Sequence, residues 1–174
     1  LVVGNDSIID LGEGVKLKVI ETPGHASHHI SIIDENGNLF VGDSAGTYMP
    51  DVNVIIPAMP PPFRFDLALK SIDKMIIEKP KTLYYSHFGS LGRAVDRLKD
   101  FKEQMKVWAQ IIRNVIEKGG TLKEAVNTVI REDWRTRERA EEILSHPIVG
   151  PLVERTVRGF IEYFKWACEK GGEQ

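Results

Sequence analysis

The first half of the chain alternates between short apolar runs and turn residues. From residue 1 to about residue 88, the apolar runs are broken by Gly, Pro, Asn and Asp. Residues 15–20 alternate apolar and polar side chains with a period of two, which predicts a strand. Two further runs, residues 30–33 and 39–41, flank Asn36-Gly37, a pair that readily takes the positive φ angles of a tight turn. This segment is therefore predicted to form a β-hairpin.

Residues 66–79 have apolar positions at helical spacing and end before Pro80. Because proline pushes the preceding residue out of helical geometry, a helix is predicted to end there. Residues 83–85 then predict another strand, which leads directly into His87.

Beyond residue 90, apolar residues recur every three or four positions and turn residues become sparse. This spacing predicts a long helix over residues 93–118, ending at Gly119-Gly120. Thr121 and Glu124 have the capping-box pattern, so a second helix is predicted to begin there. Further helices are predicted over residues 136–145 and over residues 150–169, where Pro151 is tolerated in the first turn.

The change of pattern predicts two regions, an α/β region over residues 1–90 and a C-terminal helical domain over residues 91–174. A length of 174 residues suits one well-packed domain or a small domain with a helical extension. The fold class expected is therefore α/β (α+β). The chain begins with Leu1 rather than methionine, which we interpret as a sign that it is a piece of something longer.

Composition excludes several kinds of partner. The 23 basic and 25 acidic residues give a formal net charge of −2, so neither nucleic acid nor a membrane surface is an expected partner. No stretch approaches the roughly 18 to 20 apolar residues of a spanning helix. A single cysteine, Cys168, cannot form an intramolecular disulfide, which favours a reducing compartment and hence the cytoplasm.

Candidate metal ligands follow three of the predicted strands. His25 lies in Thr22-Pro23-Gly24-His25, Asp43 follows the strand that ends at Gly42, and His87 follows residues 83–85. Imidazole and carboxylate groups are common zinc ligands, so this pattern indicates a metal site. The alternative role of Asp43 is that of an ordinary turn or cap residue.

These segments resemble, in order and spacing, the third, fourth and fifth motifs of the metallo-β-lactamase superfamily, and within it the glyoxalase II-like hydrolases. The resemblance covers roughly residues 10–90. It implies the second half of an αβ/βα sandwich, followed by a helical tail. It also implies that His25 ligates a first zinc ion, Asp43 bridges two ions and His87 ligates the second, with iron or manganese as alternative metals.

The family's first motif, His-x-His-x-Asp-His, does not occur in the chain. Three side chains would then serve two ions, whereas zinc held firmly by protein has at least three donors. We therefore expect the isolated chain to bind metal poorly and to be inactive, and we assign it no catalytic residue. In the intact protein the resemblance implies metal-assisted hydrolysis of a small-molecule thioester, lactone or ester.

Other residues receive supporting roles. His29 matches a position that is often histidine in the family and is expected to support the loop by hydrogen bonding. Tyr48, Met59 and Phe63 are hypothesised to form an apolar wall for substrate, the alternative being a packed linker. His146, before Pro147, is expected at a helix end.

Two hypotheses for function follow. The first is a metal-dependent hydrolase represented by its second half. The second is a non-catalytic module that folds by pairing with a copy of itself or with a separate N-terminal half. Half a sandwich leaves a sheet face exposed, so oligomerisation is expected under both.

Overall fold

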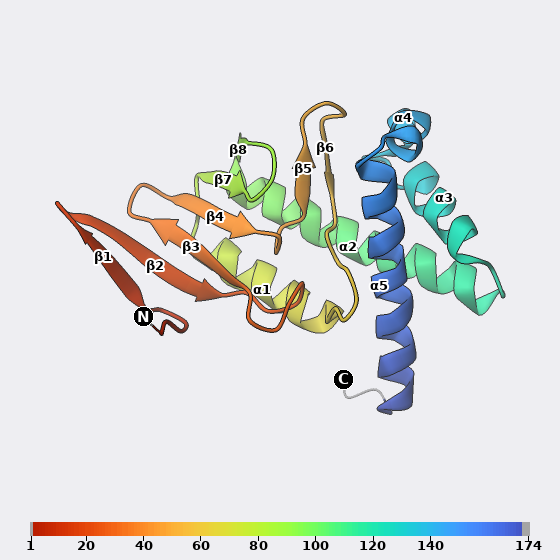
Figure 1. The fold of residues 1–174 in the computed structure, drawn as a ribbon, viewed down its shortest axis with the longest axis horizontal. Coiled ribbons are helices and arrows are strands. Elements are labelled where there is room, and N and C mark those ends of the chain that lie inside the picture. The colour runs from red at the N-terminus through yellow and green to blue at the C-terminus, as the bar shows by residue number, and fades with distance from the viewer. Residues whose placement is uncertain (1, 172–174) are drawn as a thin grey trace.

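A six-stranded sheet forms the first half of the molecule. The structure is a computed structural model and describes residues 2–171 (Figure 1). The sheet has the order β1-β2-β3-β4-β7-β8, and every neighbouring pair is antiparallel except β4 and β7, which are parallel. Its strands are β1 (Ile8–Gly12), β2 (Val15–Glu21), β3 (Ile30–Asp34), β4 (Asn38–Gly42), β7 (Thr82–Tyr85) and β8 (Ser90–Gly92). A separate two-stranded sheet pairs β5 (Thr47–Met49) with β6 (Val54–Ile56).

The predicted hairpin is confirmed by the pairing of β3 with β4. Gly37 takes a positive φ of 84° in its turn. The carboxylate of Asp34 accepts hydrogen bonds from the backbone N–H groups of Asn36 and Asn38, at 2.9 and 2.8 Å. A side chain that occupies the turn's N–H groups in this way fixes where the chain reverses, and with it the register of the two strands.

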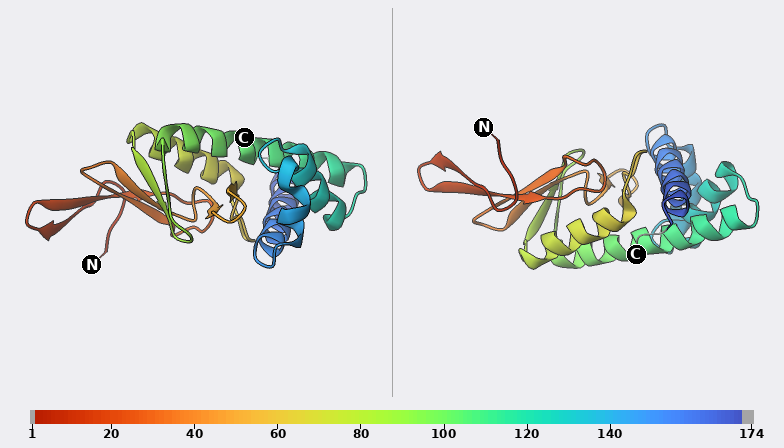
Figure 2. Two further views of the ribbon diagram at one scale, coloured as in Figure 1. Left: turned by 90° about the horizontal axis from the view of Figure 1, so that it is seen from above. Right: turned by 90° about the horizontal axis from the view of Figure 1, so that it is seen from below.

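One face of the sheet is covered by two helices, α1 (Phe65–Ile77) and α2 (Ala94–Glu117), as both views in Figure 2 show. Leu39, Val41 and Leu83 point toward this side and are fully buried. They join Ile72 and Met75 of α1 in one hydrophobic cluster. Helix α1 lies in the connection between the parallel strands β4 and β7, which explains why those two strands can run in the same direction. The mixed α/β fold class is thus confirmed.

The opposite face of the sheet carries exposed aromatic side chains. Phe40 and Tyr84 alternate with the buried residues of their strands and are directly paired across them. Their rings stack with centroids 5.1 Å apart, yet Phe40 keeps 45% and Tyr84 38% of its surface exposed. An apolar, uncovered patch therefore remains on the side away from α1 and α2.

The second half is helical, as predicted. Its further helices are α3 (Leu122–Glu132), α4 (Ala140–Ser145) and α5 (Val149–Glu169). Helix α3 begins with the predicted capping box, in which the Thr121 and Glu124 side chains each bond the other residue's backbone N–H. The helix predicted over residues 136–145 is shorter than expected. A 3-10 turn occupies Arg137–Arg139, and α4 begins only at Ala140.

The reason lies at Thr136, a fully buried residue. Its hydroxyl donates to the carbonyl oxygens of Ile130 and Asp133, at 2.8 and 3.2 Å. A hydroxyl tied to upstream carbonyls in this way favours a turn over a continuing helix. The chain therefore turns before α4 can start.

The hydrophobic core is continuous across the predicted boundary near residue 90. Helix α2 packs against α1 over the sheet and against α3 and α5 in the helical half. Its buried residues Phe101, Met105 and Trp108 belong to the same cluster as the sheet residues. The division into residues 1–90 and 91–174 stays a prediction. Among residues 2–171, no helix combines the length and the apolar character needed to cross a membrane.

Candidate metal centre

The three predicted ligands lie at one edge of the large sheet. Asp43 follows β4 directly, and His87 lies two residues beyond β7. Since β4 and β7 are parallel, their C-terminal ends meet at the same edge. His25 lies in the loop after β2, and β2 runs in the same direction as β4 because both are antiparallel to β3. The topology therefore brings together residues that are far apart in sequence.

Asp43 lies between the two imidazoles. Its Oδ2 is 3.7 Å from His25 Nε2, and its Oδ1 is 3.6 Å from His87 Nε2. The side chains of His25 and Asp43 keep 20% and 27% of their surface exposed, whereas His87 keeps 57%. One carboxylate oxygen thus faces each histidine. The predicted convergence of the three side chains is what the structure shows.

The ring of His25 is oriented by the backbone. Its Nδ1 is hydrogen-bonded to the carbonyl oxygen of Ala58. A carbonyl can only accept, so Nδ1 carries a proton, and in the neutral ring Nε2 is the nitrogen left to accept a hydrogen bond or to bind a metal ion. Gly24, just before it, has a φ of 145°, and a Cβ there would lie 2.6 Å from the Ala68 backbone. Glycine therefore allows the loop to pass against α1 and aim His25 at Asp43.

His29 holds the other side of the site. Its Nε2 accepts a hydrogen bond from the backbone N–H of Asp43 at 3.0 Å, so its proton is on Nδ1, which faces Thr22 Oγ1 at 2.8 Å. Burial, and then the neighbouring charge of His25, lower the pKa of His29, which favours this neutral form. The expected supporting role of His29 is confirmed, and His28 beside it is exposed.

A chain of buried hydroxyls continues this support. Thr22 Oγ1 contacts Ser31 Oγ at 3.0 Å, and Ser31 Oγ contacts Ser44 Oγ at 3.1 Å. Ser44 in turn donates to the carbonyl oxygen of Val41 at 2.6 Å. These bonds link β2, β3 and the end of β4. Through Thr22 and His29, these buried hydroxyls help to hold the backbone of Asp43 in place.

Gly42 completes the fit around His29. It has a φ of 58°, and a Cβ at this position would lie 2.4 Å from His29 Nε2. Any other residue would both strain the backbone and displace the imidazole. The Gly42-Asp43 pair is therefore a geometric requirement of this arrangement.

His25, Asp43 and His87 can provide part of a metal centre, but not all of its ligands. An imidazole and a carboxylate oxygen are available at each side of Asp43, which makes two donors for each of two ions. Within residues 2–171, no group of three or more His, Cys, Asp or Glu residues is arranged to hold one ion. Because zinc in proteins has three or four protein ligands, these residues alone leave each coordination shell half empty.

A cavity of about 620 Å³ opens beside these residues. Its lining includes His25, Asp43 and His87 from the edge of the sheet, and Pro147, Ile148 and Arg155 from α5 and the segment before it. Its size is that of ordinary small-molecule sites, which span about 300 to 1,000 Å³. The sequence suggested that the helical tail could cover the site, but it did not identify the residues of this wall, because nothing in the helical pattern shows which turn of α5 faces the metal ligands.

The predicted apolar wall does not line this cavity. Met59 and Phe63 are buried, with 0% and 4% of their surface exposed. Phe63 packs edge-on against Phe160 of α5, and the backbone N–H of Met59 donates to Thr156 Oγ1 at 3.3 Å. Tyr48 lines a different, smaller cavity and donates to Asn53 Oδ1. Helix α5 has covered the proline-rich segment, which leaves Ala58 and Pro60 rather than Met59 at the cavity.

Comparisons with known proteins agree with this arrangement. The model of the metallo-beta-lactamase superfamily matches residues 2–87. A metallo-beta-lactamase fold-containing protein of Sulfurisphaera tokodaii is 34% identical over 134 residues, which are 77% of this chain and 48% of that protein. The chain spans about half the length of this curated relative.

Two solved structures share the fold. An archaeal metallo-beta-lactamase superfamily protein from Sulfolobus tokodaii matches with a TM-score of 0.56 and 24% identity, over 93% of this chain and 52% of its own. A metallo-beta-lactamase family protein from Thermus thermophilus matches with a TM-score of 0.64 and 18% identity, over 98% of this chain and 50% of its own. The likeness extends over the helical half as well as the sheet.

Proposed function

Residues 2–87 belong to the metallo-beta-lactamase superfamily, and from this premise we propose that the chain provides half of the metal centre of a hydrolase. The substrate class is a thioester, lactone or ester. His25, Asp43 and His87 are the donors, and zinc is the metal, with iron and manganese as alternatives. When bound, the metal supplies Lewis acidity toward a carbonyl oxygen and lowers the pKa of water.

The observation that carries this proposal is the position of Asp43 between two imidazoles. His25 directs Nε2 toward Asp43 Oδ2, and in the neutral ring both atoms are electron donors. Two such atoms 3.7 Å apart repel each other, so a proton or a metal ion shared between them would stabilise the arrangement. A carboxylate with one imidazole at each oxygen is also what a ligand shared between two metal ions requires.

The chain's own residues prepare this arrangement without the metal. His29 and the hydroxyls of Thr22, Ser31 and Ser44 hold the backbone of Asp43, and the Ala58 carbonyl holds His25. Such supporting hydrogen bonds fix ligand orientation and tautomer in metalloproteins. The remaining donors for each ion come, on this proposal, from a polypeptide segment outside residues 2–171.

The first experiment is a zinc titration by isothermal calorimetry. With two donors for each ion, we expect the chain alone to bind zinc more weakly than about 1 μM. His25→Ala, Asp43→Asn and His87→Ala should each weaken this binding further. His28→Ala is the matched control, because His28 is an exposed neighbour in the same loop. Equal zinc binding by Asp43→Asn and the unchanged protein would refute the assignment.

The second experiment measures hydrolysis by the complete gene product that contains this chain. A panel of thioesters, lactones and aryl esters is assayed with added zinc, in the unchanged sequence and with Asp43→Asn or His28→Ala. We expect zinc-dependent turnover that Asp43→Asn abolishes and His28→Ala leaves intact. Turnover that survives Asp43→Asn would show that the reaction occurs elsewhere.

A second candidate function is that of a non-catalytic module that pairs with a copy of itself or with a separate N-terminal half. The exposed stack of Phe40 and Tyr84 favours it, because an uncovered apolar sheet face commonly marks an interface. Light scattering on the purified chain tests self-pairing. We expect a dimer that Phe40→Lys converts to a monomer, and a stable monomer without the substitution would contradict self-pairing.

A further inference from the structure

A cationic group also lines the cavity beside the metal ligands. Arg155 lines it from α5, one helical turn after Pro151, together with Leu152. Residues at positions 151 and 155 share one face of the helix, so both are directed at the same side. The ligands His25, Asp43 and His87 line the same cavity from loops at the edge of the sheet.

The guanidinium of Arg155 is not used by the fold. Within the part of the chain that the structure describes, Arg155 forms no ion pair, and its neighbour Glu154 is paired instead with Arg158 at 3.1 Å. Arg155 is exposed, so its charge does not need an internal partner. Asp43 also lines the cavity, yet it faces His25 and His87 rather than Arg155.

The surface between the two charged ends is mostly apolar. Pro147, Ile148 and Leu152 line it from the helical side, and Phe88 lines it next to His87. Ile148 and Phe88 are strongly exposed, at 53% and 48%. Apolar walls with a few placed polar groups are characteristic of sites that bind small organic molecules.

We propose that Arg155 determines specificity for a substrate that carries a carboxylate. The substrate would place its thioester, lactone or ester carbonyl at the metal ligands, an apolar spacer along Ile148 and Leu152, and a free carboxylate on Arg155. The planar guanidinium can bind a carboxylate through two parallel hydrogen bonds, which adds orientation to attraction. This inference rests on the proposed function, since it places the reacting carbonyl at His25, Asp43 and His87.

The experiment compares two esters that differ only in charge. Monomethyl glutarate has one free carboxylate, and dimethyl glutarate has none. Dissociation constants are measured by NMR titration of the metal-free protein, so the result does not depend on zinc. We expect the monomethyl ester to bind about three- to tenfold more tightly, the range for a partly exposed, bidentate pair.

Variants at Arg155 decide whether that residue is responsible. Arg155→Gln should abolish the preference for the charged ester, and Arg155→Glu should reverse it. Arg158→Gln is the matched control, because Arg158 lies on the same helix and pairs with Glu154 outside the cavity lining. The control should keep the preference. Added salt should reduce the preference, because the interaction is partly exposed.

The possible outcomes distinguish a failure of the Arg155 proposal from a failure of the metal-centre proposal. Equal binding of both esters, binding of neither, or a preference that survives Arg155→Gln would overturn the role of Arg155. If the charge preference holds while zinc binding does not depend on Asp43, the metal centre fails and the anion site stands. If zinc binding depends on Asp43 while Arg155→Gln changes nothing, only the carboxylate specificity is wrong.

Discussion

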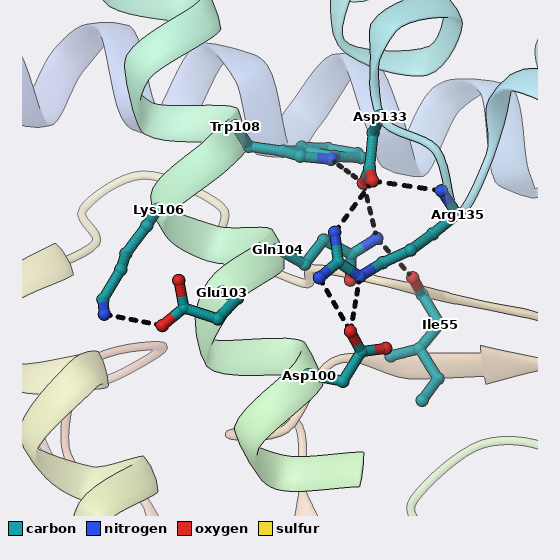
Figure 3. A network of polar contacts seen from close by, with 8 residues as sticks. All are labelled: Ile55, Asp100, Glu103, Gln104, Lys106, Trp108, Asp133 and Arg135. Carbon is teal, nitrogen blue, oxygen red and sulfur yellow. Dashed lines mark hydrogen bonds and ion pairs between the residues drawn. The ribbon is translucent and has the colours of Figure 1, made fainter. Parts of the chain in front are cut away.

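The buried carboxylate of Asp133 offers the sharpest test of how the helical half is held to the sheet. Asp133 is 1% exposed and accepts hydrogen bonds from Trp108 Nε1 at 2.8 Å and from Gln104 Nε2 at 3.2 Å. Arg135 donates to its other oxygen at 3.0 Å and also bonds Asp100 (Figure 3). Gln104 in turn donates to a carbonyl of β6. One side chain thus joins α2, the turn after α3 and the small sheet.

We expect Asp133→Ala to lower the free energy of unfolding by about 2 to 4 kcal/mol, because it leaves a buried N–H without an acceptor and removes hydrogen bonds to a charged group. The size of this loss depends on which hydrogen bonds the partners of Asp133 retain. Arg135 retains Asp100, and Gln104 retains the carbonyl of Ile55, but Trp108 Nε1 loses its acceptor. A fully buried N–H without a partner alone costs about 1 to 3 kcal/mol.

Urea unfolding followed by tryptophan fluorescence measures the change. Asp100→Ala serves as the control, because Asp100 is 42% exposed and its loss should cost no more than about 1 kcal/mol. Trp108→Phe removes the orphaned N–H, so the two substitutions combined should cost clearly less than their sum. A loss below about 1 kcal/mol for Asp133→Ala would refute the reasoning about this network.

Three further predictions concern the site and its supports. His29→Ala removes the acceptor for the Asp43 N–H, so zinc affinity measured by competition should fall about 10- to 100-fold, and an unchanged affinity would contradict the supporting role. Gly159→Ala should lower the free energy of unfolding, measured with urea, by at least about 2 kcal/mol, because its Cβ would lie 1.9 Å from the Met59 carbonyl oxygen. Gly92→Ala is the control and should cost far less, because a Cβ there has no atom within 4 Å. Partial burial opposes ionisation of Asp34, but hydrogen bonds from the turn outweigh it and hold its pKa below the usual 3.8. Asp34→Ala should therefore lower the free energy of unfolding by about 1 to 2 kcal/mol at neutral pH. This loss of stability should diminish as the pH falls from 3.8 through the lowered pKa, because the carboxylate is then protonated in both states. Urea unfolding of both proteins between pH 2 and 7 measures the difference.

Most of the regular structure could be predicted because it depends on local patterns. The long helix α2 and the capping box at Thr121 follow from spacing and end signals that lie within each segment. The strands β5, β6 and β8 have three residues each, too few to establish a period of two. The late start of α4 depends on bonds from Thr136 to carbonyl oxygens at the end of α3, which no apolar spacing reveals.

The metal ligands could be predicted from their order after three strands, whereas the cavity could not. Met59 was expected at the substrate, but it is buried because Thr156, 97 residues later, packs on its backbone. The same contact brings Arg155 to the cavity, and sequence reasoning did not find it. Which turn of a helix faces a distant loop depends on tertiary packing, so it has no signature within either segment.

The closeness of Gly159 to the Met59 carbonyl has a consequence for how molecules enter. At this point α5 packs directly against the backbone of the segment before α1, so no side chain separates the two. The backbone packing therefore fixes the distance between α5 and the edge of the sheet. We therefore expect ligands to be selected by the shape of the cavity lining rather than by a movement of α5.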